Sequence, residues 1–126
     1  MHPQQFKNVL CLSSEERYGY LLRKVAETEE VWLIRDAGSI VMLGDNEGAE
    51  SLPVFPEEEF ASILLTGDWQ NYRAEKMSVY EFIDGLDSLQ EDNIYLAGFP
   101  KDDLTAVVVS PEEMKDHLLY ELQRYE

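Results

Sequence analysis

The chain has 126 residues, of which 26 are Asp or Glu and 10 are Lys or Arg, so its formal net charge is −16. Its 44% hydrophobic content excludes intrinsic disorder, which combines high charge with few apolar residues. Nucleic acid phosphates and anionic lipids would be repelled by this charge, so we expect neither a nucleic acid nor a membrane as partner.

The length fits one domain, since domains usually contain about 100–150 residues. We therefore expect a single domain over residues 1–126, with an N-terminal segment (1–12), a first half (13–67) and a second half (68–126). The single Cys11 cannot form an internal disulfide, the first residues lack the pattern of a secretory signal, and no apolar run approaches the about 20 residues of a membrane span. These features predict a cytoplasmic protein, and they favour no particular oligomeric state.

The first half alternates between helical and strand patterns. A short helical turn is expected at 4–10. Ser13 and Glu16 have the spacing of a capping box, which predicts a helix from Ser14 to about residue 27, with Arg17 on its outer side. The elements expected next are a hairpin of strands 31–34 and 39–43, a loop at 44–48, an extended segment at 52–55, and a helix that starts at Pro56 and stops by Gly67.

The second half is predicted to follow the same order. Its expected elements are a strand at 69–77, a helix opened by a Ser78–Glu81 capping box, a hairpin of strands 93–99 and 104–109, and a final helix opened by Ser110 and Pro111. The apolar run 106–109 is typical of a central strand buried on both faces. The fold class is therefore α+β, with two β-hairpins that each lead into a helix and a sheet packed by three to four helices.

Two helix starts have similar sequences. Phe55-Pro56-Glu57-Glu58 and Ser110-Pro111-Glu112-Glu113 each follow a predicted hairpin, and Ile63-Leu64 matches Leu118-Leu119 at the same offset. A duplicated strand–strand–helix unit explains the match, and so do two independent uses of the same helix-start chemistry.

Four segments carry a resemblance to a known family. These are Val31-Trp32-Leu33, Leu52-Pro53-Val54-Phe55-Pro56, Phe99-Pro100 and Val107-Val108-Val109-Ser110-Pro111. In this order and spacing they resemble the bacterial proteins grouped as domain of unknown function 2750, from about Gln5 to Leu122. The resemblance implies a small bacterial cytosolic domain, and it transfers no catalytic residue.

No catalytic, cofactor or metal residue can be assigned from the sequence. The chain has two histidines, His2 and His117, and neither is accompanied by a nucleophile motif. A surface ion pair with Glu113, one helical turn earlier, is a sufficient explanation for the presence of His117. The run 45–48 fails the ligand spacing of a calcium loop. We therefore lean toward a protein that is not an enzyme and expect no cofactor.

Two functions from different classes remain. In the first, the acidic surface binds a basic protein, and the candidate contacts are the turn and helix-start carboxylates Asp102, Asp103, Glu112, Glu113, Glu57, Glu58 and Glu59. In the second, a small molecule or a substrate of carboxylate catalysis binds in a cleft near Trp69 and Tyr72. In a third interpretation, the acidic surface reflects only adaptation to salt and binds no specific partner.

Overall fold

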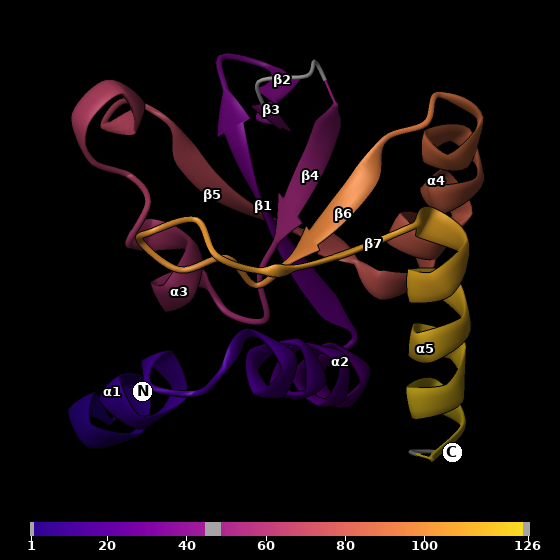
Figure 1. Ribbon diagram of the computed structural model, residues 1–126, viewed down its shortest axis with the longest axis horizontal. Coiled ribbons are helices and arrows are strands. Elements are labelled where there is room, and N and C mark those ends of the chain that lie inside the picture. Colours follow the sequence, from indigo (N-terminus) through magenta and orange to yellow (C-terminus); the bar gives the residue numbers. More distant parts are fainter. Residues whose placement is uncertain (1, 45–48, 125–126) are drawn as a thin grey trace.

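The structure is a computed structural model, and it describes residues 2–44 and 49–124. Over these residues the chain is an α+β domain, as the sequence predicts (Figure 1). The elements in order are α1 (Pro3–Leu10), α2 (Ser14–Thr28), β1 (Glu30–Asp36), β2 (Ser39–Ile40), β3 (Leu43–Gly44), β4 (Glu50–Val54), α3 (Glu58–Ser62), a 3₁₀ turn (Gly67–Trp69), β5 (Arg73–Ser78), α4 (Val79–Glu91), β6 (Tyr95–Gly98), β7 (Val107–Val109) and α5 (Pro111–Arg124).

The strands form two sheets that meet at one bridge. One sheet has the order β2-β1-β5 and is antiparallel, whereas the other has the order β3-β4-β6-β7 with a parallel pairing of β4 and β6. Trp32 of β1 and Phe55 after β4 exchange backbone hydrogen bonds of 2.9 Å, which joins the sheets. The expected strand at 39–43 is therefore wrong, because its two ends belong to different sheets.

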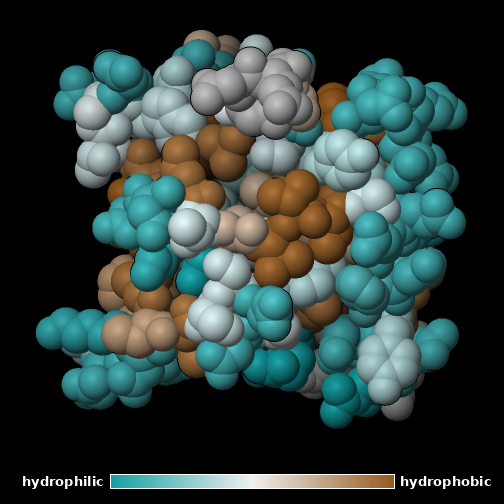
Figure 2. Space-filling model, viewed as in Figure 1, coloured by the Kyte–Doolittle hydropathy of each residue, from teal (hydrophilic) through white to brown (hydrophobic). Residues whose placement is uncertain are grey.

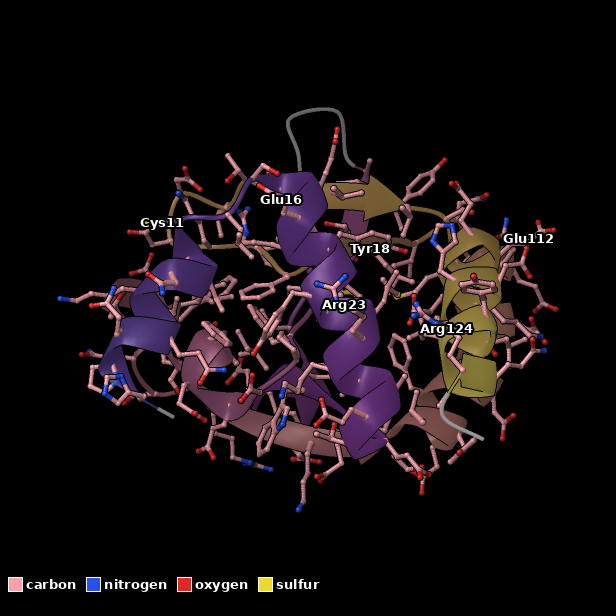
Figure 3. The ribbon with its side chains drawn as sticks, turned by 90° about the horizontal axis from the view of Figure 1, so that it is seen from below. Cys11, Glu16, Tyr18, Arg23, Glu112 and Arg124 are labelled. Carbon is pink, nitrogen blue, oxygen red and sulfur yellow. The ribbon has the colours of Figure 1, made fainter. Side chains whose placement is uncertain are left out.

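The helices close the core from below and from one side. Helix α2 packs under β1, β6 and β7, and α4 and α5 pack against each other beside the sheets (Figure 1). Seen from below, α2 crosses the front of the molecule (Figure 3). Phe55, Phe60 and Phe99 lie fully buried between these layers. Phe60 and Phe99 are in ring contact, with centroids 4.8 Å apart.

Arg17 lies in the core and not on the outer side of α2. Its side chain is 2% exposed, and its Nε and Nη groups donate to backbone carbonyls of Leu12, Phe99 and Thr105. Burial lowers the pKa of Arg17, and the nearby Asp103 carboxylate opposes that shift. Arg17 lies on the same helical face as Tyr20 and Leu21, which follow it by three and four residues. Periodicity alone does not show that backbone carbonyl groups from other segments accept hydrogen bonds from a buried guanidinium at this position.

Two predicted elements in the middle of the chain are shorter than expected. Helix α3 ends at Ser62, because the chain continues in tight turns and then reaches the left-handed Gly67 at φ 58°. Trp69 and Tyr72 precede β5, so the strand predicted at 69–77 begins only at Arg73. Pro53 is part of β4 although proline has no backbone N–H to donate. The strand tolerates it because β3 pairs only with Glu50 and Ser51, so no hydrogen bond to β3 is expected at Pro53.

The apolar run 106–109 is not a central strand. Strand β7 forms the edge of its sheet, and its three residues alternate between the two faces. Val109 faces inward at 7% exposure, while Val108 is 58% exposed. The prediction from continuous hydrophobicity is wrong here because one apolar side chain is left facing outward.

The helix starts follow the sequence with two exceptions, at α3 and α4. Helix α3 begins at Glu58 with Glu57 as its N-cap, so Pro56 lies before the helix and not at its first position. Ser13 and Glu16 form a reciprocal capping box, and Ser110 and Glu113 make the same pair of bonds at α5. At α4 the Ser78 hydroxyl accepts from the Tyr80 backbone N–H, so the Ser78–Glu81 box is replaced by a simple cap. The two matched dipeptides differ in burial: Leu64 is buried, whereas its counterpart Leu119 is exposed. The 45–48 run lies outside the described residues.

Candidate functional site

The loop between β6 and β7 is held in place by the buried Arg17. The Arg17 Nε donates to the Phe99 carbonyl at 3.2 Å, and one Nη donates to the Thr105 carbonyl at 2.7 Å. Phe99 and Leu104 have left-handed backbone conformations, with φ of 61° and 64°. Such conformations are strained for bulky residues and persist when surrounding contacts enforce them. Arg17 thus fixes the loop near both of its ends.

A turn inside the loop adds a second constraint. The Thr105 hydroxyl and backbone N–H donate to one carboxylate oxygen of Asp103, at 2.7 and 3.0 Å. These bonds lower the pKa of Asp103, with smaller contributions from Lys101 and Arg17. The Leu104 backbone N–H donates to the Lys101 carbonyl at 2.8 Å. The loop therefore presents Leu104 on a backbone that is fixed from within.

Leu104 stands between two surface hollows. One, of about 330 Å³, is lined by Ile63, Leu64, Thr66, Asp68, Trp69, Asp102 and Leu104. The other, of about 250 Å³, is lined by Leu43, Gly44, Ala49, Glu50, Ser51, Tyr95, Leu104 and Val108. We call the two hollows together the Leu104 groove. The groove runs from the 3₁₀ turn, past the loop, onto the outer face of the four-stranded sheet.

Some of the residues that line the groove are exposed apolar side chains. Leu104 is 50% exposed, Tyr95 is 46% exposed and Val108 is 58% exposed. Figure 2 shows hydrophobic residues gathered on the face that β6 and β7 present in Figure 1, with hydrophilic residues around them. An apolar patch with a polar rim is a common form of protein interaction surface.

Among the described residues, the charged groups that line the groove are carboxylates. Asp68 and Asp102 lie in the first hollow, and Glu50 lies in the second. No Lys or Arg lines either hollow among the described residues. The groove therefore combines apolar surface with negative charge.

The structure brings together residues of both sequence hypotheses. Trp69, predicted to line a ligand cleft, and Asp102, predicted to contact a partner, line the same hollow. Tyr72 packs against Trp69, with ring centroids 5.8 Å apart and an interplanar angle of 34°. Tyr72 is not among the residues that line the hollow.

The remaining predicted acids lie elsewhere or already have partners in the fold. Asp103 binds Thr105, Glu113 completes the α5 capping box, and Glu57 accepts a hydrogen bond of 2.6 Å from the Tyr20 hydroxyl. Glu58 and Glu59 line a different hollow, between α1 and α3. Glu112 is exposed at the start of α5, where its backbone N–H donates to the Gln90 side chain at 3.2 Å.

His117 has an interior partner that the sequence did not indicate. The Tyr18 hydroxyl and His117 Nδ1 share a hydrogen bond of 2.7 Å between α2 and α5. Burial raises the pKa of Tyr18, and the Glu113 carboxylate adds to the shift. Tyr18 points from α2 toward α5 in Figure 3. The pair joins the two helices and lines neither hollow of the Leu104 groove.

Sequence reasoning missed the exposed apolar residues. The sequence predicts Leu104, Val108 and Tyr95 in strands, where apolar residues normally contribute to the core, but β7 begins only at Val107 and Leu104 lies in the loop before it. Period-2 alternation along 107–109 places Val108 opposite Val107 and Val109, but a run of three valines carries no polar marker for the outer face. The described residues contain no group of three or more His, Cys, Asp or Glu able to hold a metal ion.

The fold and groove define a small α+β domain with an acidic, apolar surface site. Residues 18–118 match the family described as a protein of unknown function, DUF2750, so the chain belongs to that family. The match begins directly after Arg17 and includes the whole Leu104 groove. Neither the curated proteins nor the solved structures include a match to this chain. No helix among the described residues has the length and apolar character needed to cross a membrane.

Proposed function

We propose that this protein is a non-enzymatic interaction domain whose Leu104 groove binds a basic segment of a protein partner. The observation that carries the proposal is the half-exposed Leu104, fixed in a left-handed conformation between two hollows that are lined by carboxylates. The partner segment would have an apolar side chain flanked by Lys or Arg.

Each part of such a segment has a place in the groove. An apolar side chain fits the hollow between Trp69 and Leu104, where it would be removed from water. Lys or Arg side chains on either side fit Asp68 and Asp102 in that hollow and Glu50 in the next. The formal charge of −16 attracts cationic segments over a distance and accelerates their association.

The fixed loop lowers the cost of binding. Arg17 and the Asp103–Thr105 turn already hold the backbone around Leu104, so little loop entropy remains to be lost when a partner docks. Glu58, by contrast, lines the hollow between α1 and α3, which neither Arg17 nor the Asp103–Thr105 turn borders. The interaction is proposed for the cytoplasm of a bacterial cell, which the lone Cys11 and the family resemblance support.

A second candidate function uses the same hollow. Its volume of about 330 Å³ lies within the range of small-molecule sites, about 300–1,000 Å³, and Trp69 offers a ring for stacking. A small-molecule binder or a carboxylate-based enzyme would use Asp68 and Asp102 for polar contact. The basic-segment function is favoured because the apolar surface continues past Leu104 to Tyr95 and Val108, over more area than a small ligand needs.

The test uses a fluorescent peptide of alternating lysine and leucine, with a lysine–serine peptide of equal charge for comparison. Fluorescence anisotropy is expected to show binding of the lysine–leucine peptide that weakens as salt is raised, since screening lengths fall to about 8 Å at physiological ionic strength. Asp102→Asn is expected to weaken binding, and Leu104→Gly to abolish it while relieving the left-handed strain at that residue.

The matched control is Asp84→Asn, which removes the same charge from the exposed face of α4. If Asp84→Asn weakens binding as much as Asp102→Asn, or if both peptides bind equally, the acidity acts only as a diffuse field and reflects salt adaptation. If binding is insensitive to salt and to both neutralisations, the cleft near Trp69 and Tyr72 becomes the better explanation.

A further inference from the structure

A separate apolar cavity lies where α4 crosses the junction of the two sheets. Its volume is about 150 Å³, and it shares no lining residue with the Leu104 groove. Aliphatic side chains of β1, β2 and β4 form one wall together with Met42 and Met77. Phe82, Gly85 and Glu81 belong to the α4 wall.

The size and lining of the cavity fit a small aromatic ring. An engineered apolar cavity of about 150 Å³ in another protein binds benzene. Thioether sulfur atoms make favourable contacts with aromatic rings, and methionine side chains adapt to the shape of a ligand. Met42 and Met77, each partly buried, supply two such groups, and Phe82 supplies a ring for edge or offset contact.

Gly85 leaves the α4 side of the cavity open. It is in the middle of α4, where glycine is a poor helix former, and a Cβ at this position would meet no atom within 4 Å. Packing in the empty protein therefore does not require glycine here. A side chain at this position would take up space at the opening of the cavity.

Glu81 is the one charged residue that lines the cavity. It lies one turn before Gly85 on the same face of α4, and no ion pair or hydrogen bond engages its carboxylate among the described residues. We propose that this cavity binds a small aromatic amine, with the ring between Met42, Met77 and Phe82 and the ammonium group at Glu81. Charge complementarity selects the amine over an aromatic acid of the same size.

Benzylamine is the probe, and benzyl alcohol and benzoate are compared with it. The protein is labelled with ¹³C at its methionine methyl groups, and NMR follows their signals during titration. We expect the Met42 and Met77 signals to shift and saturate, while Met114, which is buried among other residues, stays unchanged. Benzyl alcohol is expected to bind, and benzoate to bind more weakly than either.

Two variants test the parts of the site. Glu81→Gln is expected to weaken benzylamine binding about threefold, the effect of a solvent-exposed charge pair, and to leave benzyl alcohol binding unchanged. Asp84→Asn is the matched control on the same helix. Gly85→Leu, which places a side chain at the opening, is expected to abolish binding of both, and Gly85→Ala should raise the melting temperature of the free protein through helix propensity.

The proposal is overturned if benzylamine leaves Met42 and Met77 unchanged, or if Met114 shifts to the same extent. Equal binding of benzoate and benzylamine, or equal effects of Glu81→Gln and Asp84→Asn, would also overturn it. Because the cavity and the Leu104 groove share no lining residue, peptide binding is expected to be the same in Gly85→Leu as in the wild type. The two sites can therefore fail independently.

Discussion

The inner and outer faces of the four-stranded sheet are made by the same strands and differ in what covers them. The inner face packs against α2, where Tyr18 lies directly against Gly98. The outer face leaves Tyr95 46% exposed and Val108 58% exposed. Both faces carry apolar side chains, so composition does not distinguish them. What differs is whether another part of the chain covers the face, and an uncovered apolar face is available for a partner.

The loop at 99–106 connects these two environments. Arg17, buried on the α2 side, holds the backbone from which Leu104 projects to the other side. The four predictions below test whether the inner face determines stability while the outer face contributes little to it. They are ordered from the largest expected effect to the smallest.

Arg17→Met should destabilise the protein most. It removes the donors for the carbonyl groups of Leu12, Phe99 and Thr105, and each buried group left unpaired costs roughly 1–3 kcal/mol. We expect a loss of at least about 3 kcal/mol in the free energy of unfolding, measured by urea denaturation. Arg17→Lys should lose less, since an ammonium group keeps the charge and part of the bonding. An effect below about 1 kcal/mol for Arg17→Met would contradict the role assigned to this residue.

Gly98→Ala should be the next most harmful change. The added Cβ would lie 2.4 Å from the Tyr18 ring, so the ring must move, and overpacking of this kind costs about 1–3 kcal/mol. Gly44→Ala is the control, because a Cβ there meets nothing within 4 Å. Tyr18→Leu combined with Gly98→Ala should recover part of the loss in a double-mutant cycle. If the two glycine variants are equally stable, the close packing at Gly98 is not required.

Val109→Ala and Val108→Ala compare the two faces at neighbouring positions. Val109 is 7% exposed, so its truncation should cost about 2 kcal/mol, whereas Val108 is 58% exposed and its truncation should cost less than about 0.5 kcal/mol. Val108→Ala should nevertheless weaken binding of the lysine–leucine peptide. The comparison fails if the two variants lose equal stability.

Asp103→Ala should have the smallest effect, and this effect should depend on pH. The hydrogen bonds from Thr105 lower the folded-state pKa of Asp103 below its ordinary value of about 3.9, so the ionised carboxylate stabilises the fold above that pH. The gap in melting temperature between wild type and Asp103→Ala should be widest near neutral pH and close as the pH falls below about 4. Asp102→Ala is the control, because it removes the same charge from the next position and Asp102 makes no hydrogen bond to the described residues.

The sequence alone determined the α+β class, the family and most helix starts. Ser13–Glu16 and Ser110–Glu113 are local signals, because a capping box involves residues only three apart and its bonds form within one turn. Helical periodicity likewise predicted the helix from Ser14 to about residue 27, whose Leu21, Leu22 and Val25 are buried in the structure. Such features depend on neighbours in the chain and can be read without the fold.

The tertiary structure decided the features that depend on distant contacts. Arg17 is buried because carbonyl groups as far along the chain as Phe99 and Thr105 accept its hydrogen bonds, at sequence separations of 82 and 88 residues. Val108 is exposed because it points to the outer face of the four-stranded sheet, away from α2, and Trp69 shares a hollow with Asp102 because the loop folds back beside the 3₁₀ turn. The elements that pack against a strand or helix determine which of its sides is covered. The sequence pattern alone records only whether each residue is apolar or charged.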